Sequence, residues 1–215
     1  MPMTLAFAIS ALAVVSGCSS SGKPEVASTF ASSPTDSVTT STPTGPPDLR
    51  TASLAVSDLP TGWTVSTDAT AVSLGENGCL KTAGRRTATK TSRYLTFAGP
   101  GAAPVFSESL AYFPASAIAA NYADAVKALN GCRKVSIKAG KVTLTGILSP
   151  TSAPTVGLES KLYTLIAPAG GHVLTEYILV SHTARILMLT SYATVKNPSI
   201  GDFLTLSGKA AAKLS

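Results

Sequence analysis

The sequence is poor in the residues that most often carry catalytic or metal chemistry. Among 215 residues it has two histidines and three cysteines. It contains no G-x-S-x-G, H-E-x-x-H, phosphate-binding glycine loop or cysteine-rich metal pattern. The enzyme and metalloprotein classes that these local motifs identify are therefore excluded. A Ser/His/Asp triad stays open, because its members can lie far apart in the chain.

Charged residues and long apolar runs are also scarce. Charged residues make up 13% of the chain, with 17 Lys and Arg against 11 Asp and Glu. A membrane-spanning helix needs about 20 consecutive apolar residues, and the longest apolar run, "LAFAISALAVV" at residues 5–15, is shorter. Small residues, Ser16 and Gly17, follow it. An apolar run of this length before small residues is typical of a secretory signal peptide.

Cys18 comes directly after this small pair. The tetrad "VSGC" resembles a bacterial lipobox, in which the cysteine sulfur is acylated and the cysteine becomes the first residue after cleavage. We therefore predict a signal peptide over residues 1–17 and a lipid anchor at Cys18, which would hold the protein on the outer face of the cytoplasmic membrane. The start, "MPMT", departs from the signal-peptide pattern because it has no Lys or Arg. The alternative is a secreted protein in which Cys18 is incidental.

The segment after Cys18 is predicted to be a tether. Ser, Thr, Pro and Gly supply 21 of the 29 residues at 19–47, without an apolar periodicity that could bury one face. We expect residues 18–47 to form a disordered, lipid-anchored linker whose ends lie roughly 30 Å apart. Residues 48–215 are then expected to form one extracellular domain.

Periodicity and turn residues in this domain predict an α+β fold. A short helix is expected within residues 48–60, and an extended segment at 62–65. Strands are expected at 92–99, 104–113, 141–148, 158–167, 172–181 and 184–192, and helices at 116–129 and after Pro198. Strands, a helix, a four-strand meander and a closing helix together predict a curved antiparallel sheet with helices on one face, the C-terminal helix among them.

Two cysteines remain in the domain, Cys79 and Cys132. In an exported protein the simplest expectation is one disulfide between them. In the chain-entropy model, closing a loop of this length stabilises the domain by about 4 kcal/mol. Two buried free thiols are the alternative.

The order of these features resembles the PknH-like extracellular sensor domain of actinobacterial envelope lipoproteins and receptor kinases. The resemblance rests on "SDLPTGW" at residues 57–63, then Cys79, a strand ending at Phe113, an Ala-rich helix running into Cys132, and a meander with a final helix. It implies a ligand- or partner-binding domain with a central cleft and no catalysis.

Positive charge is concentrated in "CLKTAGRRTATKTSR" at residues 79–93, which has no acidic residue. Its five cations are Lys81, Arg85, Arg86, Lys90 and Arg93. On an exported domain such a patch could bind anionic lipid headgroups, wall polymers or acidic glycans, whereas export makes nucleic acid an unsuitable partner. A solvated loop whose cations only aid solubility is the alternative.

The tryptophan and the two histidines are further candidates for a functional site. Trp63, the single tryptophan, follows a turn and would either line a binding cleft or belong to the core. His172 and His182 each adjoin a predicted turn, and we expect both at the surface.

These observations favour a monomeric, non-enzymatic, lipid-anchored envelope protein that binds a ligand or partner through a cleft on its sheet. We expect no cofactor, no metal and no catalytic residue. A lipid or glycolipid carrier is the first alternative, and a hydrolase with an unrecognised triad is the second.

Overall fold

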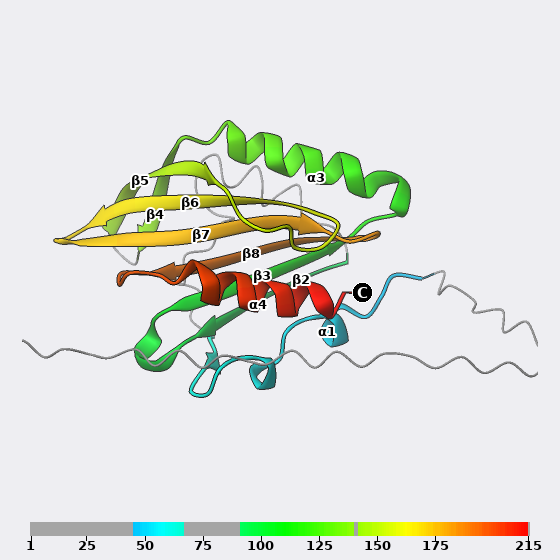
Figure 1. Ribbon diagram of the computed structural model, residues 1–215, viewed down its shortest axis with the longest axis horizontal. Coiled ribbons are helices and arrows are strands. Elements are labelled where there is room, and N and C mark those ends of the chain that lie inside the picture. Colours follow the sequence, from blue (N-terminus) through cyan, green and yellow to red (C-terminus); the bar gives the residue numbers. More distant parts are fainter. Residues whose placement is uncertain (1–44, 67–90, 140–141, 215) are drawn as a thin grey trace, which may run out of the picture. The chain divides into compact units, whose positions relative to one another are not determined.

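Eight strands form one antiparallel sheet in the spatial order β1-β2-β3-β8-β7-β6-β5-β4 (Figure 1). The structure is a computed structural model that describes residues 45–66, 91–139 and 142–214. These residues belong to one compact unit, Pro43–Ser215. The strands are β1 (Thr64–Val65), β2 (Ser92–Ala98), β3 (Val105–Tyr112), β4 (Lys134–Ala139), β5 (Val142–Thr151), β6 (Glu159–Ala169), β7 (His172–His182) and β8 (Ile186–Thr194).

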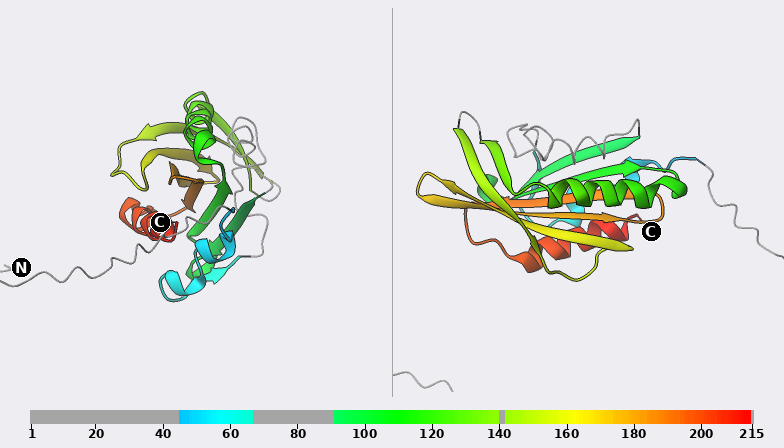
Figure 2. Two further views of the ribbon diagram at one scale, coloured as in Figure 1. Left: turned by 90° about the vertical axis from the view of Figure 1, so that its right-hand side faces the viewer. Right: turned by 90° about the horizontal axis from the view of Figure 1, so that it is seen from above.

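The two long helices cover opposite faces of the sheet. Helix α3 (Ala115–Asn130) contacts β7 and β8 from one side, and α4 (Ile200–Ala212) contacts the same strands from the other. The end-on view in Figure 2 shows the curved sheet with one of these helices on each side. The short elements α1 (Leu49–Ala52) and η1 (Val56–Asp58) lie on the α4 side, and η2 (Pro100–Ala102) links β2 to β3.

Strand β8 shows why helices pack on both faces of the sheet. All nine of its residues are buried. Leu187 and Leu189 belong to the core cluster under α3, while Ile186 and Met188 belong to the cluster under α4. Because successive side chains of a strand point to opposite faces, a strand whose residues are all buried must be covered on both sides.

The helices begin and pack as their sequences suggest. In α3, the side chains of Ile118, Tyr122, Ala125 and Leu129 are buried, at the spacing of one helical face. Helix α4 begins after Ser199, whose hydroxyl accepts a hydrogen bond from the backbone N–H of Asp202 at 3.1 Å. This N-cap satisfies one of the otherwise unpaired N–H groups at the helix start.

The predicted α+β class with a curved antiparallel sheet is confirmed, with two differences in detail. Helices were expected on one face, but α3 and α4 lie on opposite faces because β7 and β8 present apolar side chains to both sides. Strand β4 was not predicted, although Val135 and Ile137 alternate with polar residues and are buried. In the described ranges, no helix combines the length and apolar character needed to span a membrane.

Candidate functional site

A groove runs along one flank of α3, beside the start of β6. It consists of two adjoining pockets of ≈ 410 Å³ and ≈ 550 Å³ that share Asn130. The first is lined by α3 and Glu159, and the second by the ends of α3 and β5, the following residues Ser152 and Ala153, and the first half of β6. We refer to both pockets together as the α3 groove.

The helical period explains the α3 side of this groove. Its lining residues recur three or four positions apart, which places them in one stripe along the helix. They are Ala119, Tyr122, Ala123, Val126, Lys127 and Asn130. The two alanines leave space beside the sheet, while the tyrosine, lysine and asparagine supply polar groups.

Asn130 and Tyr163 join the two pockets. The hydroxyl of Tyr163 donates a hydrogen bond to Oδ1 of Asn130 at 2.9 Å. Burial raises the pKa of Tyr163, so this hydroxyl keeps its proton at neutral pH. Because Asn130 is exposed and its oxygen is engaged, its amide N–H groups are available to a ligand in the groove.

Tyr122 lines the first pocket and carries a buried hydroxyl. Its side chain is 4% exposed, and its hydroxyl oxygen has no hydrogen-bond partner among the described residues. Burial, with smaller effects of Glu159 and Tyr163, raises the pKa of Tyr122 to about 12. A buried hydroxyl without a partner costs about 1–3 kcal/mol.

His182 packs against Tyr122 and is largely buried, with 9% exposed. The two rings are 4.8 Å apart between centroids. Nδ1 of His182 is 2.9 Å from the carbonyl oxygen of Thr183, and Nε2 is 3.9 Å from Oε2 of Glu159. The prediction that His182 lies at the surface was wrong, because the end of β7 runs under α3. His172 is exposed, as expected.

The surroundings of His182 differ from a hydrolase triad. Its hydrogen bond goes to a backbone carbonyl, and its nearest carboxylate is beyond hydrogen-bonding distance. Within the described ranges, no group of three or more His, Cys, Asp or Glu side chains could hold a metal ion. The lining of the α3 groove offers hydroxyl, amide and charged groups.

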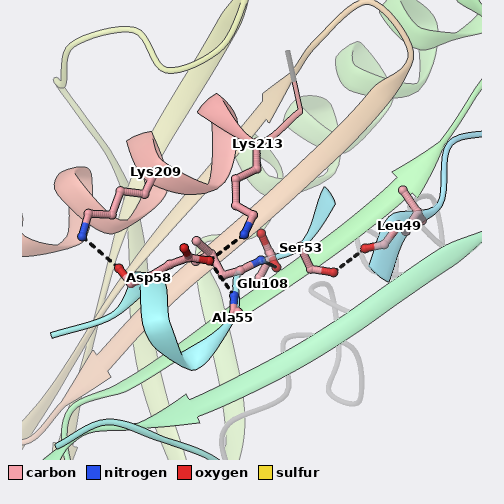
Figure 3. Close-up of polar contacts among 8 residues, drawn as sticks. Leu49, Ser53, Ala55, Asp58, Glu108, Lys209 and Lys213 are labelled. Carbon is pink, nitrogen blue, oxygen red and sulfur yellow. Dashed lines mark hydrogen bonds and ion pairs between the residues drawn. The ribbon is translucent and has the colours of Figure 1, made fainter. Parts of the chain in front are cut away.

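A second polar site lies on the opposite face, around Glu108 of β3 (Figure 3). Glu108 is 1% exposed, and its Oε2 accepts the backbone N–H of Leu54 at 3.0 Å, whereas Oε1 has no partner among the described residues. Burial raises the pKa of Glu108 to about 7, although the Leu54 N–H and nearby Lys213 and Arg93 oppose the rise.

Asp58 ties the same segment to α4. Its Oδ2 accepts the backbone N–H of Ala55 and pairs with Nζ of Lys213, each at 2.7 Å, and its carbonyl oxygen accepts Nζ of Lys209 at 2.8 Å (Figure 3). The Ala55 N–H, followed by Lys213, lowers the pKa of Asp58. Residues 54–58 are thus fastened to both β3 and α4.

Comparison with known proteins identifies a shared fold. No protein-family model and no curated protein matches the sequence. Among solved structures, the chain resembles the extracellular domain of PknH from Mycobacterium tuberculosis, with a TM-score of 0.51 and 12% sequence identity, covering 71% of this chain and 77% of that chain. At this identity the likeness to PknH shows the fold alone, which is the fold that the sequence resemblance implied.

The structure places few of the predicted site residues. Trp63 is 8% exposed and packs in the core beside Tyr192, with ring centroids 6.4 Å apart, and it lines none of the described pockets. Cys132 is buried. Arg93 is half-buried on β2. The other predicted site residues, Cys18, Cys79, Lys81, Arg85, Arg86 and Lys90, lie outside the described residues, so the anchor, the disulfide and the full patch stay predictions.

Sequence reasoning missed Tyr122, Asn130, Glu108 and Glu176 as functional candidates. Tyr122 lies within the helix predicted at residues 116–129, which by itself does not indicate a functional role. A carboxylate inside an apolar strand is the signal that could have marked Glu176, which is fully buried and has no hydrogen-bond partner for either oxygen among the described residues. The hydroxyl of Ser191 faces this carboxyl and partly offsets the effect of burial, which raises the pKa of Glu176 to about 8.

Proposed function

We propose that this protein is a lipid-anchored cell-envelope protein whose extracellular domain binds a ligand or partner in the α3 groove without catalysis. The observation that carries the proposal is the buried, unpartnered hydroxyl of Tyr122 in the wall of a groove. An unpaired buried hydroxyl lowers stability, so its position in a pocket favours a role in binding.

Two further observations support an exported, non-catalytic domain. The similar structure is the extracellular domain of PknH. The sequence before the domain has the apolar run, the lipobox-like tetrad ending in Cys18 and the Ser/Thr/Pro-rich tether described above. Each of these features is typical of a domain that works outside the cytoplasmic membrane.

The groove lining favours a polar ligand over an acyl chain. A lipid or glycolipid carrier needs a continuous apolar cavity. The second pocket is instead lined largely by polar side chains, among them Thr151, Ser152, Ser160 and Lys161. We therefore favour a domain that binds a small ligand or partner with several hydrogen-bonding groups, and a lipid carrier is the less favoured alternative.

Native mass spectrometry of the protein purified from its own host tests this proposal. We expect a retained ligand of defined mass on the wild-type protein and about tenfold weaker retention by Tyr122→Phe, which removes only the hydroxyl. Tyr177→Phe is the matched control, because Tyr177 contacts Phe203 on the α4 side of the sheet, away from the groove.

Two results would contradict the proposal. Co-purified acyl lipid would favour the carrier. A retained ligand that Tyr122→Phe and Tyr177→Phe bind as well as the wild type would place the binding site elsewhere.

A further inference from the structure

A third pocket lies between α1 and the start of β2, outside the α3 groove. It has a volume of ≈ 270 Å³ and is lined by residues 47–50 and 91–93. Two of its lining residues are arginines, Arg50 from α1 and Arg93 from β2. Two segments far apart in the sequence therefore each contribute an arginine to the lining of one small pocket.

Arg93 carries a positive charge that is not paired within the described residues. Its Nε is buried and has no hydrogen-bond partner among the described residues. Glu108 is near enough for Arg93 to oppose the rise in its pKa, yet no described carboxylate forms an ion pair with either arginine within 4.0 Å. An anion in the pocket would pair with these two positive charges.

The position of Arg50 is fixed by the contacts around it. The carboxylate of Asp48 accepts the backbone N–H of Arg50 at 2.9 Å, and the backbone N–H of Leu54, four residues further on, donates to Oε2 of Glu108 at 3.0 Å. Because Asp48 also lines the pocket, its charge offsets one of the two arginines, and the lining keeps one net positive charge. The pocket therefore presents positive charge on a segment that is held in place.

We propose that this Arg50–Arg93 pocket binds a single phosphate group. Guanidinium groups donate paired hydrogen bonds to phosphate oxygens, and two of them on different elements can hold a tetrahedral group from two sides. The hydroxyl-bearing residues Thr91 and Ser92 line the same pocket. Inorganic phosphate and the phosphodiester of an anionic lipid headgroup share this chemistry.

The pocket lies close in sequence to the predicted lipid anchor, which makes a lipid headgroup one possible source of the phosphate. Pro47, the last residue of the predicted tether, is one of its lining residues. The pocket is thus only 29 residues after Cys18, the predicted anchor. A phospholipid headgroup is within reach of such a tether, so the experiment must separate a lipid from free phosphate.

Calorimetric titration of the full chain with inorganic phosphate and with glycerophosphodiester tests the pocket itself. We expect Arg93→Gln and Arg50→Gln to weaken binding about tenfold or more, because each removes a charged donor. Arg133→Gln, an exposed arginine after α3, is the control for total charge. Unchanged melting temperatures verify folding, and if Arg93→Gln fails to fold, Arg50→Gln carries the test.

Flotation with phosphatidylglycerol vesicles, in the Cys18→Ala background, identifies the source. Binding that depends on Arg50 and is absent with phosphatidylcholine vesicles indicates a lipid headgroup, whereas calorimetric binding without vesicle binding indicates free phosphate. The proposal is overturned if neither probe binds, or if Arg133→Gln weakens binding as much as Arg50→Gln and Arg93→Gln do. That last result would indicate attraction by overall charge alone.

Discussion

Replacing Glu176 by Gln should remove a loss of unfolding free energy that the protein shows at neutral and alkaline pH. Glu176 is fully buried on β7, where it faces the Ser191 hydroxyl but has no partner with hydrogen-bond geometry in the described ranges. Burial raises its pKa from 4.5 to about 8. The folded state therefore binds a proton that the unfolded chain has already lost between these two values.

The sign of the effect follows from this proton. The stability that Glu176 contributes is fully present below about pH 4.5 and is lost as the pH rises to about 8. Each pH unit within this window lowers the unfolding free energy by about 1.4 kcal/mol for one proton, so the decline between pH 5 and 8 is on the order of 4 kcal/mol. Gln keeps the shape of the side chain and does not titrate, so Glu176→Gln should remove this part of the decline.

Urea unfolding at pH 5, 6, 7 and 8 measures the difference. We expect the wild type to lose stability steadily across this range. Glu176→Gln should lose several kcal/mol less, with the remaining slope coming from Glu108, whose pKa of about 7 is also raised by burial. Glu159→Gln is the control, because Glu159 is 60% exposed. A wild type that is equally stable at pH 5 and 8, or a Glu176→Gln variant with the same slope as the wild type, would refute the reasoning.

Two further predictions concern the core and the anchor. Phe203→Ala should lower the unfolding free energy by about 3–5 kcal/mol in urea titrations, because Phe203 is fully buried against Phe106, Tyr177 and Tyr192; a loss below 1 kcal/mol would contradict this packing. Mass spectrometry of membrane-extracted protein should show an acylated N-terminal cysteine, and Cys18→Ala should release the protein without changing its melting temperature; an intact Met1 on the mature protein would contradict the anchor.

Much of the fold could be predicted because its signals are local. The stripe from Ile118 to Leu129 follows the helical period, and Ser199 marks the start of α4 through an N-cap that the structure shows. Strand β4 carries an equally local signal, the alternation around Val135, which was overlooked. The distribution of helices over the two faces depends on β8, whose consecutive apolar residues Ile186–Leu189 point to both faces and do not show which helix covers each side.

The candidate sites could not be predicted in this way, because they depend on which distant segments meet. Asn130 meets Tyr163 across 33 positions, and Leu54 meets Glu108 across 54. Periodicity indicates that Tyr122 is buried, but only the packing of α3 on the sheet shows that its hydroxyl has no described partner. Arg93 was predicted as part of a cationic patch, and the approach of α1 puts Arg50 beside it at one pocket.

The contacts of Asp58 and Leu54 determine how the domain would carry a mechanical load. If the tether before residue 45 is pulled, the force enters through α1 and reaches the Glu108–Leu54 hydrogen bond and the links from Asp58 to Lys209 and Lys213. These bonds join the start of the domain to β3 and to its last helix, so the pull is divided between two elements. The tension is thereby shared before it reaches the two-residue edge strand β1, which alone would be easily peeled from the sheet.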